Sequence, residues 1–293
     1  MEGLAESALD GAHACVLCYG ASGSGKTHTM LGLPEFDEHS TLDDPGAGIL
    51  PRLVGAVFHR SRELGGQLHF RVSIFEIYLD EVRDLLGAQD EVPAGLHGVL
   101  APGSYRGDTR IPQGSSHVPV AQWEVTSPTE AWALLGWARR RRVSAVTAIH
   151  EHSSRSHLLI RIRAGVGEAL DGELQGGELV MVDLAGSERL KRSLAEGLRL
   201  REAQTISAGL SALGNVIAAL GQRSRGAPRP HVPYRDNVLT RALGRVLAAP
   251  SSKVSVICTV SPEEADRSET IATLDFAQRL QCVELVTAAA AAE

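Results

Sequence analysis

The 293-residue chain is 43% hydrophobic and 22% charged, and its formal net charge is −6. This composition suits one large α/β domain with a full core and excludes a disordered or fibrous chain. The sequence has no apolar run of membrane-spanning length and no basic-then-apolar leader, so we expect a cytoplasmic protein without a membrane span. The four cysteines lie in apolar segments and favour reduced thiols in the core over a zinc site.

The stretch CVLCYGASGSGKTHTMLG, residues 15–32, gives the first chemical signal. Its apolar start predicts a buried strand, and the spacing G-x-x-x-x-G-K-[ST] follows directly. The glycines would let successive backbone N–H groups point into one concavity, which Lys26 closes with a positive charge. Thr27 would offer a hydroxyl to Mg²⁺ at the start of a helix, whose amide dipoles also favour an anion. A flexible Gly/Ser linker, the alternative, explains neither Lys26 nor the preceding strand.

The next segments predict scaffold elements. Residues 70–86 indicate a buried strand that feeds a helix around Asp80 and Glu81. Residues 89–114 are rich in Gly, Pro and polar side chains and are expected to be loop with short strands. Residues 128–142 predict an amphipathic helix with an acidic first turn and basic last turns. Its four final arginines could suggest nucleic acid, but a solvated helix end is favoured, so we expect no nucleic-acid partner.

Two later segments place polar groups beside predicted strands. HEHSSRSHLLIRIR, residues 150–163, is a hydroxyl-rich cluster that runs into an alternating strand, as a nucleotide sensor requires; a Ser-rich turn is the alternative. ELVMVDLAGSERL, residues 178–190, predicts a hydrophobic strand that ends in Asp183 and is followed by Gly186 and Glu188. A carboxylate at the tip of a buried strand can hold Mg²⁺, directly or through water, opposite the phosphate loop.

A partner surface is indicated further along the chain. Residues 204–220 carry a helical apolar stripe that must pack on a sheet, and this leaves the opposite face of the helix free. Six arginines then face a single acid, Asp236, which suggests an acidic partner; a solvated charged face is the alternative. The six are Arg223, Arg225, Arg229, Arg235, Arg241 and Arg245.

Six segments follow one another in a distinctive order: YGASGSGKTHTM, SSRSH, VDLAGSER, ISAGLSALGNVIAAL, HVPYRDNVLTRAL and ETIATLDFAQR. Their order and approximate spacing resemble those of the kinesin motor domain, over most of the chain from Gly11 to Glu284. The resemblance implies a three-layer phosphate-loop NTPase fold, with a central, mostly parallel sheet flanked by helices. It also implies ATP and Mg²⁺ as ligands, a microtubule (tubulin) as partner and a cytoskeletal location, with the cargo unknown.

The resemblance implies roles for individual residues around the phosphates. Lys26 would neutralise charge on the β- and γ-phosphates, Thr27 and Ser154 would lie at Mg²⁺, and Asp183 would anchor the metal through water. The phosphate loop as a whole would comprise Gly20, Ala21, Ser22, Gly23, Ser24, Gly25, Lys26 and Thr27.

Two switch segments and a track surface are implied in the same way. Ser153 and Ser154 would lie near the γ-phosphate, and the Gly186 amide would sense it. Arg155 would form a gate with Glu188 when the γ-phosphate is bound. The residues implied to face tubulin are Arg235, Arg241 and Arg245.

Several positions depart from the usual kinesin pattern: Ala21, Ser22, His150, Ser207, Ala208, Gly209 and Val238. The changes near the switches are expected to weaken coupling between nucleotide and track. Ala208 and Val238 replace usual cations and are expected to remove two tubulin contacts.

The ends of the chain also differ from that pattern. We expect residues 1–293 to form a single motor domain that is incomplete at its N-terminus, with residues 253–260 as an exposed sheet edge. Residues 286–293 form an alanine-rich tail, and the preceding VEL resembles kinesins with a C-terminal motor. Two functions stay open: an ATP-hydrolysing microtubule motor domain, and a non-motile microtubule-binding or regulatory module with impaired turnover.

Overall fold

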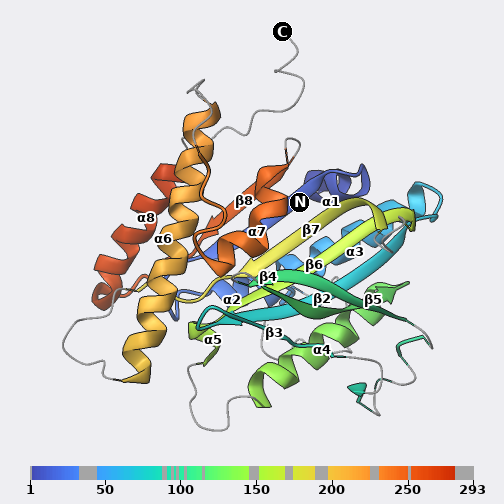
Figure 1. Cartoon of the computed structure of the whole chain (residues 1–293), viewed down its shortest axis with the longest axis horizontal. Coiled ribbons are helices and arrows are strands. Elements are labelled where there is room, and N and C mark those ends of the chain that lie inside the picture. The colour runs from blue at the N-terminus through green and yellow to red at the C-terminus, as the bar shows by residue number, and fades with distance from the viewer. Residues whose placement is uncertain are drawn as a thin grey trace.

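The computed structural model describes residues 2–32, 45–87, 91–93, 96, 99–101, 104–113, 116–144, 152–168, 174–188, 197–224, 231–249 and 252–280. Its strands form one eight-stranded sheet in the order β4-β5-β2-β6-β7-β1-β8, with β3 paired to β2 (Figure 1). The strands are β1 (His13–Tyr19), β2 (His69–Tyr78), β3 (Glu81–Asp84), β4 (Tyr105–Gln113), β5 (Ser116–Val125), β6 (His157–Glu168), β7 (Leu174–Asp183) and β8 (Lys253–Cys258). The helices are α1 (Glu2–Leu9), α2 (Lys26–Leu31), α3 (Ile49–Glu63), α4 (Pro128–Ser144), α5 (His152–Arg155), α6 (Leu198–Ser224), α7 (Val238–Ala248) and α8 (Arg267–Leu280).

The direction of the strands corrects one expectation, because the sheet is mostly antiparallel rather than mostly parallel. Among the described strands only β1 pairs in parallel, with β7 on one side and β8 on the other. The pairs β2–β3, β2–β5, β2–β6, β4–β5 and β6–β7 are all antiparallel. For β2–β3, β4–β5 and β6–β7 the physical reason is a short connection: β4 ends at Gln113 and β5 begins at Ser116, for example, and a strand that returns so soon must pair antiparallel.

The helix expected around Asp80 and Glu81 is a hairpin turn instead. Leu79 and Asp80 both have positive φ, 51° and 60°, and this pair reverses the chain so that β3 returns along β2. Asn237, at the N-terminus of α7, donates from Nδ2 to Asp80 Oδ1 at 3.0 Å. A contact from a distant part of the chain thus holds the turn and overrides the local helical pattern.

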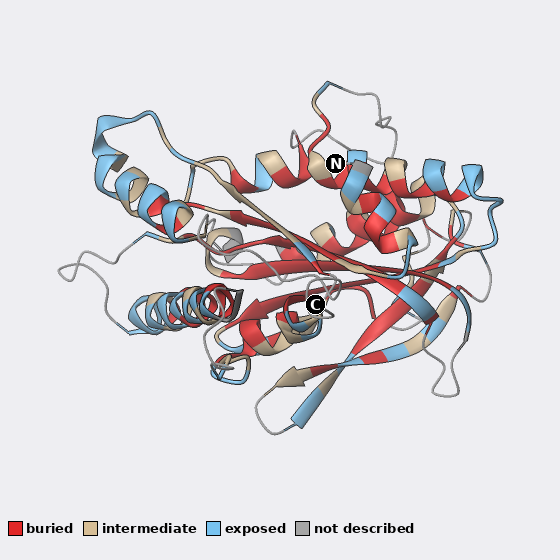
Figure 2. Cartoon of the chain, turned by 90° about the horizontal axis from the view of Figure 1, so that it is seen from above, coloured by how far each residue is buried: buried red, intermediate tan, exposed pale blue. Residues whose placement is uncertain are grey.

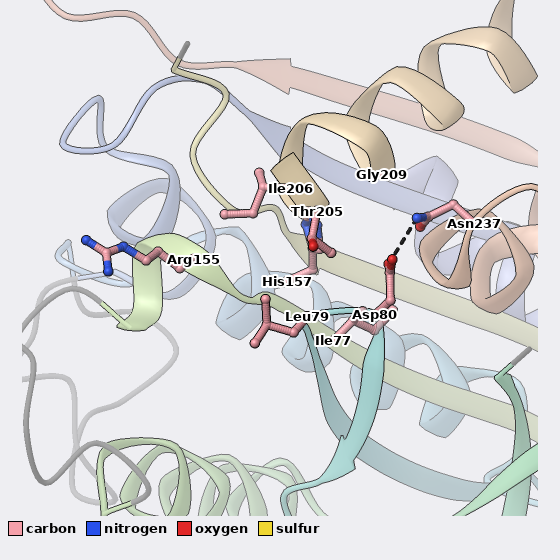
Figure 3. Close-up of a pocket in the computed structure, with 9 residues that line it drawn as sticks. All are labelled: Ile77, Leu79, Asp80, Arg155, His157, Thr205, Ile206, Gly209 and Asn237. Carbon is pink, nitrogen blue, oxygen red and sulfur yellow. Dashed lines mark hydrogen bonds between the residues drawn. The ribbon is translucent and has the colours of Figure 1, made fainter. Parts of the chain in front are cut away.

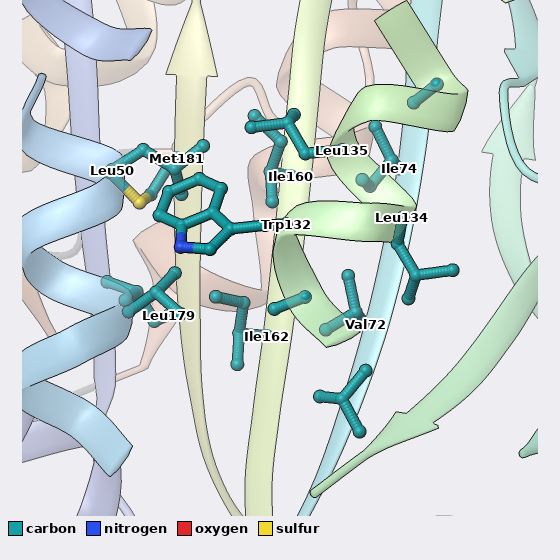
Figure 4. Packing of buried hydrophobic residues seen from close by; sticks show 14 of the residues in the cluster. Leu50, Val72, Ile74, Trp132, Leu134, Leu135, Ile160, Ile162, Leu179 and Met181 are labelled. Atoms are coloured by element: carbon teal, nitrogen blue, oxygen red, sulfur yellow. The ribbon is translucent and has the colours of Figure 1, made fainter. Parts of the chain in front are cut away.

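Helices cover both faces of the sheet, and alternate residues of each strand enter two separate hydrophobic clusters (Figure 2). In β1, Val16 packs in the cluster with α1, α3 and α4, whereas Leu17 packs in the cluster with α6, α7 and α8. Trp132 of α4 extends over the sheet toward Met181 and Leu50 (Figure 4). The predicted three-layer arrangement is therefore present.

The long helix α6 is amphipathic. Over Leu198–Gln222 it is long and apolar enough to cross a membrane by length and composition alone, with a mean hydropathy of 1.3. Its residues Leu213 and Val216 are fully buried in the cluster shared with α7 and α8, while Ala208 is exposed. The stripe predicted over residues 204–220 is buried at Leu210, Leu213, Ile217 and Leu220, whereas Leu198 and Leu200 near the start of the helix are exposed.

The strand β8 occupies one edge of the sheet, as expected for residues 253–260. Its inner side pairs with β1 from Ala14 to Tyr19, and no strand of the described part of the chain pairs with its outer side. Its residues are half-buried or exposed.

Candidate functional site

The phosphate loop lies between β1 and α2, the strand–turn–helix context that its spacing predicted. Gly25 precedes the helix with φ of 99°, a conformation that favours glycine. A Cβ on Gly20 would lie 2.3 Å from the carbonyl oxygen of Thr259, and Ser24 Oγ lies 2.7 Å from Thr259 Oγ1. The end of β8 therefore packs closely against the loop and supports its shape.

Lys26 folds back into the loop. Its Nζ donates to the carbonyl oxygens of Gly20 at 3.0 Å and Ala21 at 2.8 Å, and the side chain is buried. Burial lowers the pKa of Lys26, while Asp183 and Glu188 oppose this shift. A positive charge thus lies inside the concavity of the loop, where it can meet an anion.

Asp183 lies at the end of β7, beside the start of α2, and is 2% exposed. Thr27 Oγ1 donates to its Oδ2 at 2.6 Å, whereas its Oδ1 is buried without a hydrogen-bond partner in the described part of the chain. Burial raises the pKa of Asp183, against the Thr27 hydrogen bond and the charges of Arg142 and Lys26. A buried oxygen left over beside a hydroxyl fits a hard cation such as Mg²⁺, which prefers oxygen ligands.

Two loops next to this carboxylate are tied together. The Gly186 amide donates to the Ser154 carbonyl oxygen at 2.8 Å, and the Ala185 amide donates to His157 Nδ1 at 3.0 Å. Burial lowers the pKa of His157 to about 3, so the ring is neutral and can accept this hydrogen bond. Sequence reasoning missed His157, although its place at the entrance of a predicted strand was a usable signal. For Ser153 the structure describes only the backbone, in α5.

The two residues expected to form a gate have other partners here. Glu188 is exposed, and its carboxylate accepts from Ser22 N at 2.8 Å and from Ser22 Oγ at 2.7 Å. Arg155 donates from Nη1 to Glu202 Oε2 at 2.8 Å. Glu202, on α6, also accepts from the Tyr78 hydroxyl at 2.7 Å. The pair between Arg155 and Glu188, expected for the γ-phosphate-bound state, stays a prediction.

A cavity of about 10 Å³ lies behind the switch loops (Figure 3). It is lined by Arg155 of α5, His157 of β6 and residues of β2, the β2–β3 turn, α6 and the N-terminus of α7. A Cβ on Gly209 would lie 3.3 Å from Asn237 Oδ1, so this position of α6 comes close to the residue that holds the turn. The space suffices for about one water molecule, which excludes a nucleotide here.

The arginines of the predicted basic patch do not lie in one group. Arg235 is exposed, and its carbonyl oxygen accepts from Arg241 Nε at 2.7 Å, so these two residues lie together at the start of α7. Arg245 is exposed but close enough to the buried Glu178 to help lower the pKa of that carboxyl. Val238, expected to mark a lost track contact, is buried in the core. His150, Arg225, Arg229, Cys282, the side chain of Arg223 and the tail 286–293 lie outside the described residues.

Comparisons with known proteins agree on one family. The kinesin motor domain model matches residues 1–283. Relatives include the kinesin-like protein KIN-14R of Oryza sativa subsp. japonica, 35% identical over 286 residues (96% of this chain, 26% of that protein). The kinesin heavy chain of Drosophila melanogaster is 36% identical over 280 residues (95% of this chain, 26% of that protein).

The solved structures agree. The motor domain of the kinesin-like protein Kar3 of Saccharomyces cerevisiae has a TM-score of 0.71 and 32% identity, covering 96% of this chain and 78% of that one. A fast kinesin has a TM-score of 0.71 and 31% identity, covering 98% and 75%. Against the curated relatives the chain spans much less, between 24% and 37% of their lengths.

Proposed function

The chain belongs to the kinesin motor domain family, the ATP-driven microtubule motors, and from this premise we propose that it hydrolyses Mg²⁺–ATP and couples the bound nucleotide to microtubule affinity. The observation that carries the proposal is the meeting of Lys26, Thr27 and Asp183 at the end of β1 and β7. A positive charge inside a glycine-rich turn and a buried acidic oxygen beside it are the parts that phosphoryl transfer needs.

The residues divide the binding task. The amides of the phosphate loop, residues 20–27, and the Lys26 ammonium would bind the β- and γ-phosphates. Thr27, Ser154 and, through water, Asp183 would hold Mg²⁺, which neutralises charge on the phosphate oxygens when bound. The Gly186 amide, which now donates to Ser154, would turn to the γ-phosphate. Binding of the third phosphate would therefore rearrange the contact between the two switch loops.

The gate would close by an exchange of partners. Glu188 would leave Ser22, and Arg155 would leave Glu202, so that the two could pair. Glu202 belongs to α6, the helix that the family resemblance places near the track. The exchange would thus connect the phosphate loop with the helix that meets the microtubule, and a change of this kind can alter affinity only if the two states bind the track differently.

The track surface would include the exposed face of α6 and the pair formed by Arg235 and Arg241. Tubulin presents an acidic surface to kinesins, and opposite charge across an interface raises the association rate and fixes orientation. With this partner we infer a location on the cytoskeleton, in the cytoplasm.

A non-motile microtubule-binding module is the second candidate. The observation that favours it is that Arg155 and Glu188 each make strong contacts with residues other than one another. A chain held in this arrangement would bind the track without nucleotide-dependent changes.

Co-sedimentation with microtubules tests both candidates. We expect tight binding with a non-hydrolysable ATP analogue, weaker binding with ADP, and salt-sensitive binding in both states. The double variant Arg235→Glu with Arg241→Glu should sediment less in both nucleotides. The control Arg62→Glu with Arg140→Glu reverses two exposed charges on α3 and α4, across the sheet from α6, and should sediment like wild type.

Two further results would change the conclusion. Equal sedimentation in the two nucleotides would favour the binding module. Equal affinity of the wild type and Lys26→Ala for a fluorescent ATP analogue would overturn the phosphate site itself.

A further inference from the structure

The four arginines that end α4 are not equivalent, which corrects the prediction of a solvated helix end. Arg140 is exposed, whereas Arg142, two residues before the end of the helix, is only 7% exposed. Burying a guanidinium is costly unless it is paired and hydrogen-bonded. The contacts of Arg142 therefore require an explanation.

Arg142 reaches across to the segment that follows α5. Its Nη2 donates to the Ser156 carbonyl oxygen at 3.1 Å and to Ser156 Oγ at 2.9 Å. Ser156 is fully buried and comes directly after Arg155. One side chain at the end of α4 thus fixes the chain just beyond the first switch.

Glu76 supports this contact from the sheet. It lies in β2, is 1% exposed, and its Oε2 is 3.5 Å from Arg142 Nε. A buried ion pair is weak evidence for stability, because apolar residues of similar size often replace it without loss. A role in holding one particular geometry is the better explanation of this pair.

The geometry it holds is that of the candidate site. The residues on both sides of Ser156 bond to the loop after Asp183: Ser154 O accepts from Gly186, and His157 Nδ1 accepts from Ala185. Fixing Ser156 therefore fixes the turn of α5 that carries Ser154 and Arg155.

We propose that Arg142 is a positioning residue for nucleotide hydrolysis. Together with Glu76 it holds Ser156, and so fixes Ser154, whose carbonyl oxygen accepts from Gly186, and Arg155, which pairs with Glu202. The inference rests on the proposed ATPase function. Arg142 acts on the site through Ser156, and its charge also opposes the rise in the pKa of Asp183; no contact with the nucleotide is proposed for it. The phosphate loop itself is built from β1 and α2 and does not depend on this contact. Loss of Arg142 should therefore slow turnover far more than it weakens nucleotide binding, since small misplacements of reacting groups cost about 100-fold in rate.

Three variants test this. Arg142→Met removes one ion-pair partner of the buried Glu76, leaves Arg83 Nη1 at 4.0 Å from its Oε1, and should be less stable. The double variant Arg142→Met with Glu76→Leu replaces the ion pair by apolar groups and should recover stability. Arg140→Met removes an exposed charge from the same helix and serves as the control. For each we would measure urea unfolding, kcat and KM for microtubule-stimulated ATP hydrolysis, and equilibrium affinity for a fluorescent ADP analogue.

We expect the folded double variant to lose about 10- to 100-fold in kcat, while KM and ADP affinity stay within about threefold and the control matches wild type. A double variant that hydrolyses ATP at the wild-type rate would overturn the inference. Equal losses in kcat and ADP affinity would also overturn it, because they indicate general damage to the site. A wild-type chain that does not hydrolyse ATP would overturn the proposed function instead, and the inference with it.

Discussion

Two buried carboxylates lie on β7, and their surroundings shift their pKa values in opposite directions. Glu178 and Asp183 are each 2% exposed. Glu178 accepts from Arg161 Nε at 2.7 Å, and Arg163 Nε lies 3.6 Å from the same oxygen. Burial alone would raise the pKa of Glu178, but Arg161, Arg163 and Arg245 outweigh burial and hold the pKa below its usual value.

At Asp183 the charges of Arg142 and Lys26 also oppose burial, but they do not outweigh it. It receives a hydrogen bond from Thr27, its second oxygen has no partner in the described part of the chain, and burial raises its pKa. Both carboxylates are equally buried, so burial does not separate a structural acid from a functional one. The difference lies in whether the fold itself supplies the compensating charge, since a carboxylate left short of partners is suited to an external cation.

Of the variants that test this comparison, Glu178→Gln should have the largest effect on stability. It leaves Arg161 and Arg163 buried without their counter-charge, so the free energy of unfolding should fall by about 3 to 5 kcal/mol. Urea unfolding at pH 7 measures this. Glu6→Gln, which removes one side of an exposed pair with Arg60, should cost less than about 1 kcal/mol. Equal losses in the two variants would contradict the assignment of Glu178.

Asp183→Asn should weaken Mg²⁺ binding without loss of stability. The free energy of unfolding should be unchanged or raised, because the variant removes a carboxylate whose ionisation burial disfavours. The apparent Mg²⁺ affinity of the nucleotide complex should fall by about 10- to 100-fold, as for groups that orient a metal's ligands. Titration of Mg²⁺ at fixed fluorescent nucleotide measures this, with the exposed Asp275→Asn as control. An unchanged Mg²⁺ dependence would exclude Asp183 from the metal site.

The pH dependence of stability should separate the two acids by sign. Glu178 has a lowered pKa, so its stabilisation is present above its ordinary value of 4.5 and is lost as pH falls through the lower folded value. Asp183 has a raised pKa, so its cost is absent below 3.8 and appears as pH rises through the higher folded value. In urea unfolding between pH 3 and 7, the deficit of Glu178→Gln and the gain of Asp183→Asn should both shrink in acid. A deficit that grows in acid would contradict the sign for Glu178.

The smallest effect should come from His13, whose Nδ1 lies 3.9 Å from Glu178 Oε2. Burial lowers the pKa of His13, although Glu178 opposes this, so the ring is neutral at pH 7. His13→Gln should therefore change the free energy of unfolding by less than about 1 kcal/mol. Urea unfolding at pH 7 checks this, and a loss as large as that of Glu178→Gln would show that His13 shares the compensation.

The phosphate loop was predictable because its signal is local. Residues 15–27 contain the strand, the glycines, Lys26 and Thr27 in one stretch, and Asp183 could be placed because its strand ends visibly in the sequence. The strand directions were not predictable in this way, since they depend on where turns fall, and the turn at Leu79 and Asp80 depends on Asn237 from a distant segment.

The buried ion pairs were even less predictable from the sequence. Arg161, Arg163 and Glu178 look like ordinary polar positions of two strands until the register of β6 and β7 brings them together on one face. Arg142 looks like its three neighbours until the helix is placed against β2. In both cases the decisive information is which segments become neighbours, and this is set by long-range packing.

The contact between Glu188 and Ser22 has a consequence for which nucleotide the loop retains. The carboxylate occupies the Ser22 N–H of the anion-binding loop, so it acts as a tethered competitor for any third phosphate that needs this donor. A ligand that must displace such a competitor binds with an apparent affinity reduced by the fraction of molecules in which the donor is free. A diphosphate that does not reach Ser22 escapes this reduction. If the third phosphate uses the Ser22 N–H, the contact would lower the apparent affinity for a triphosphate relative to a diphosphate.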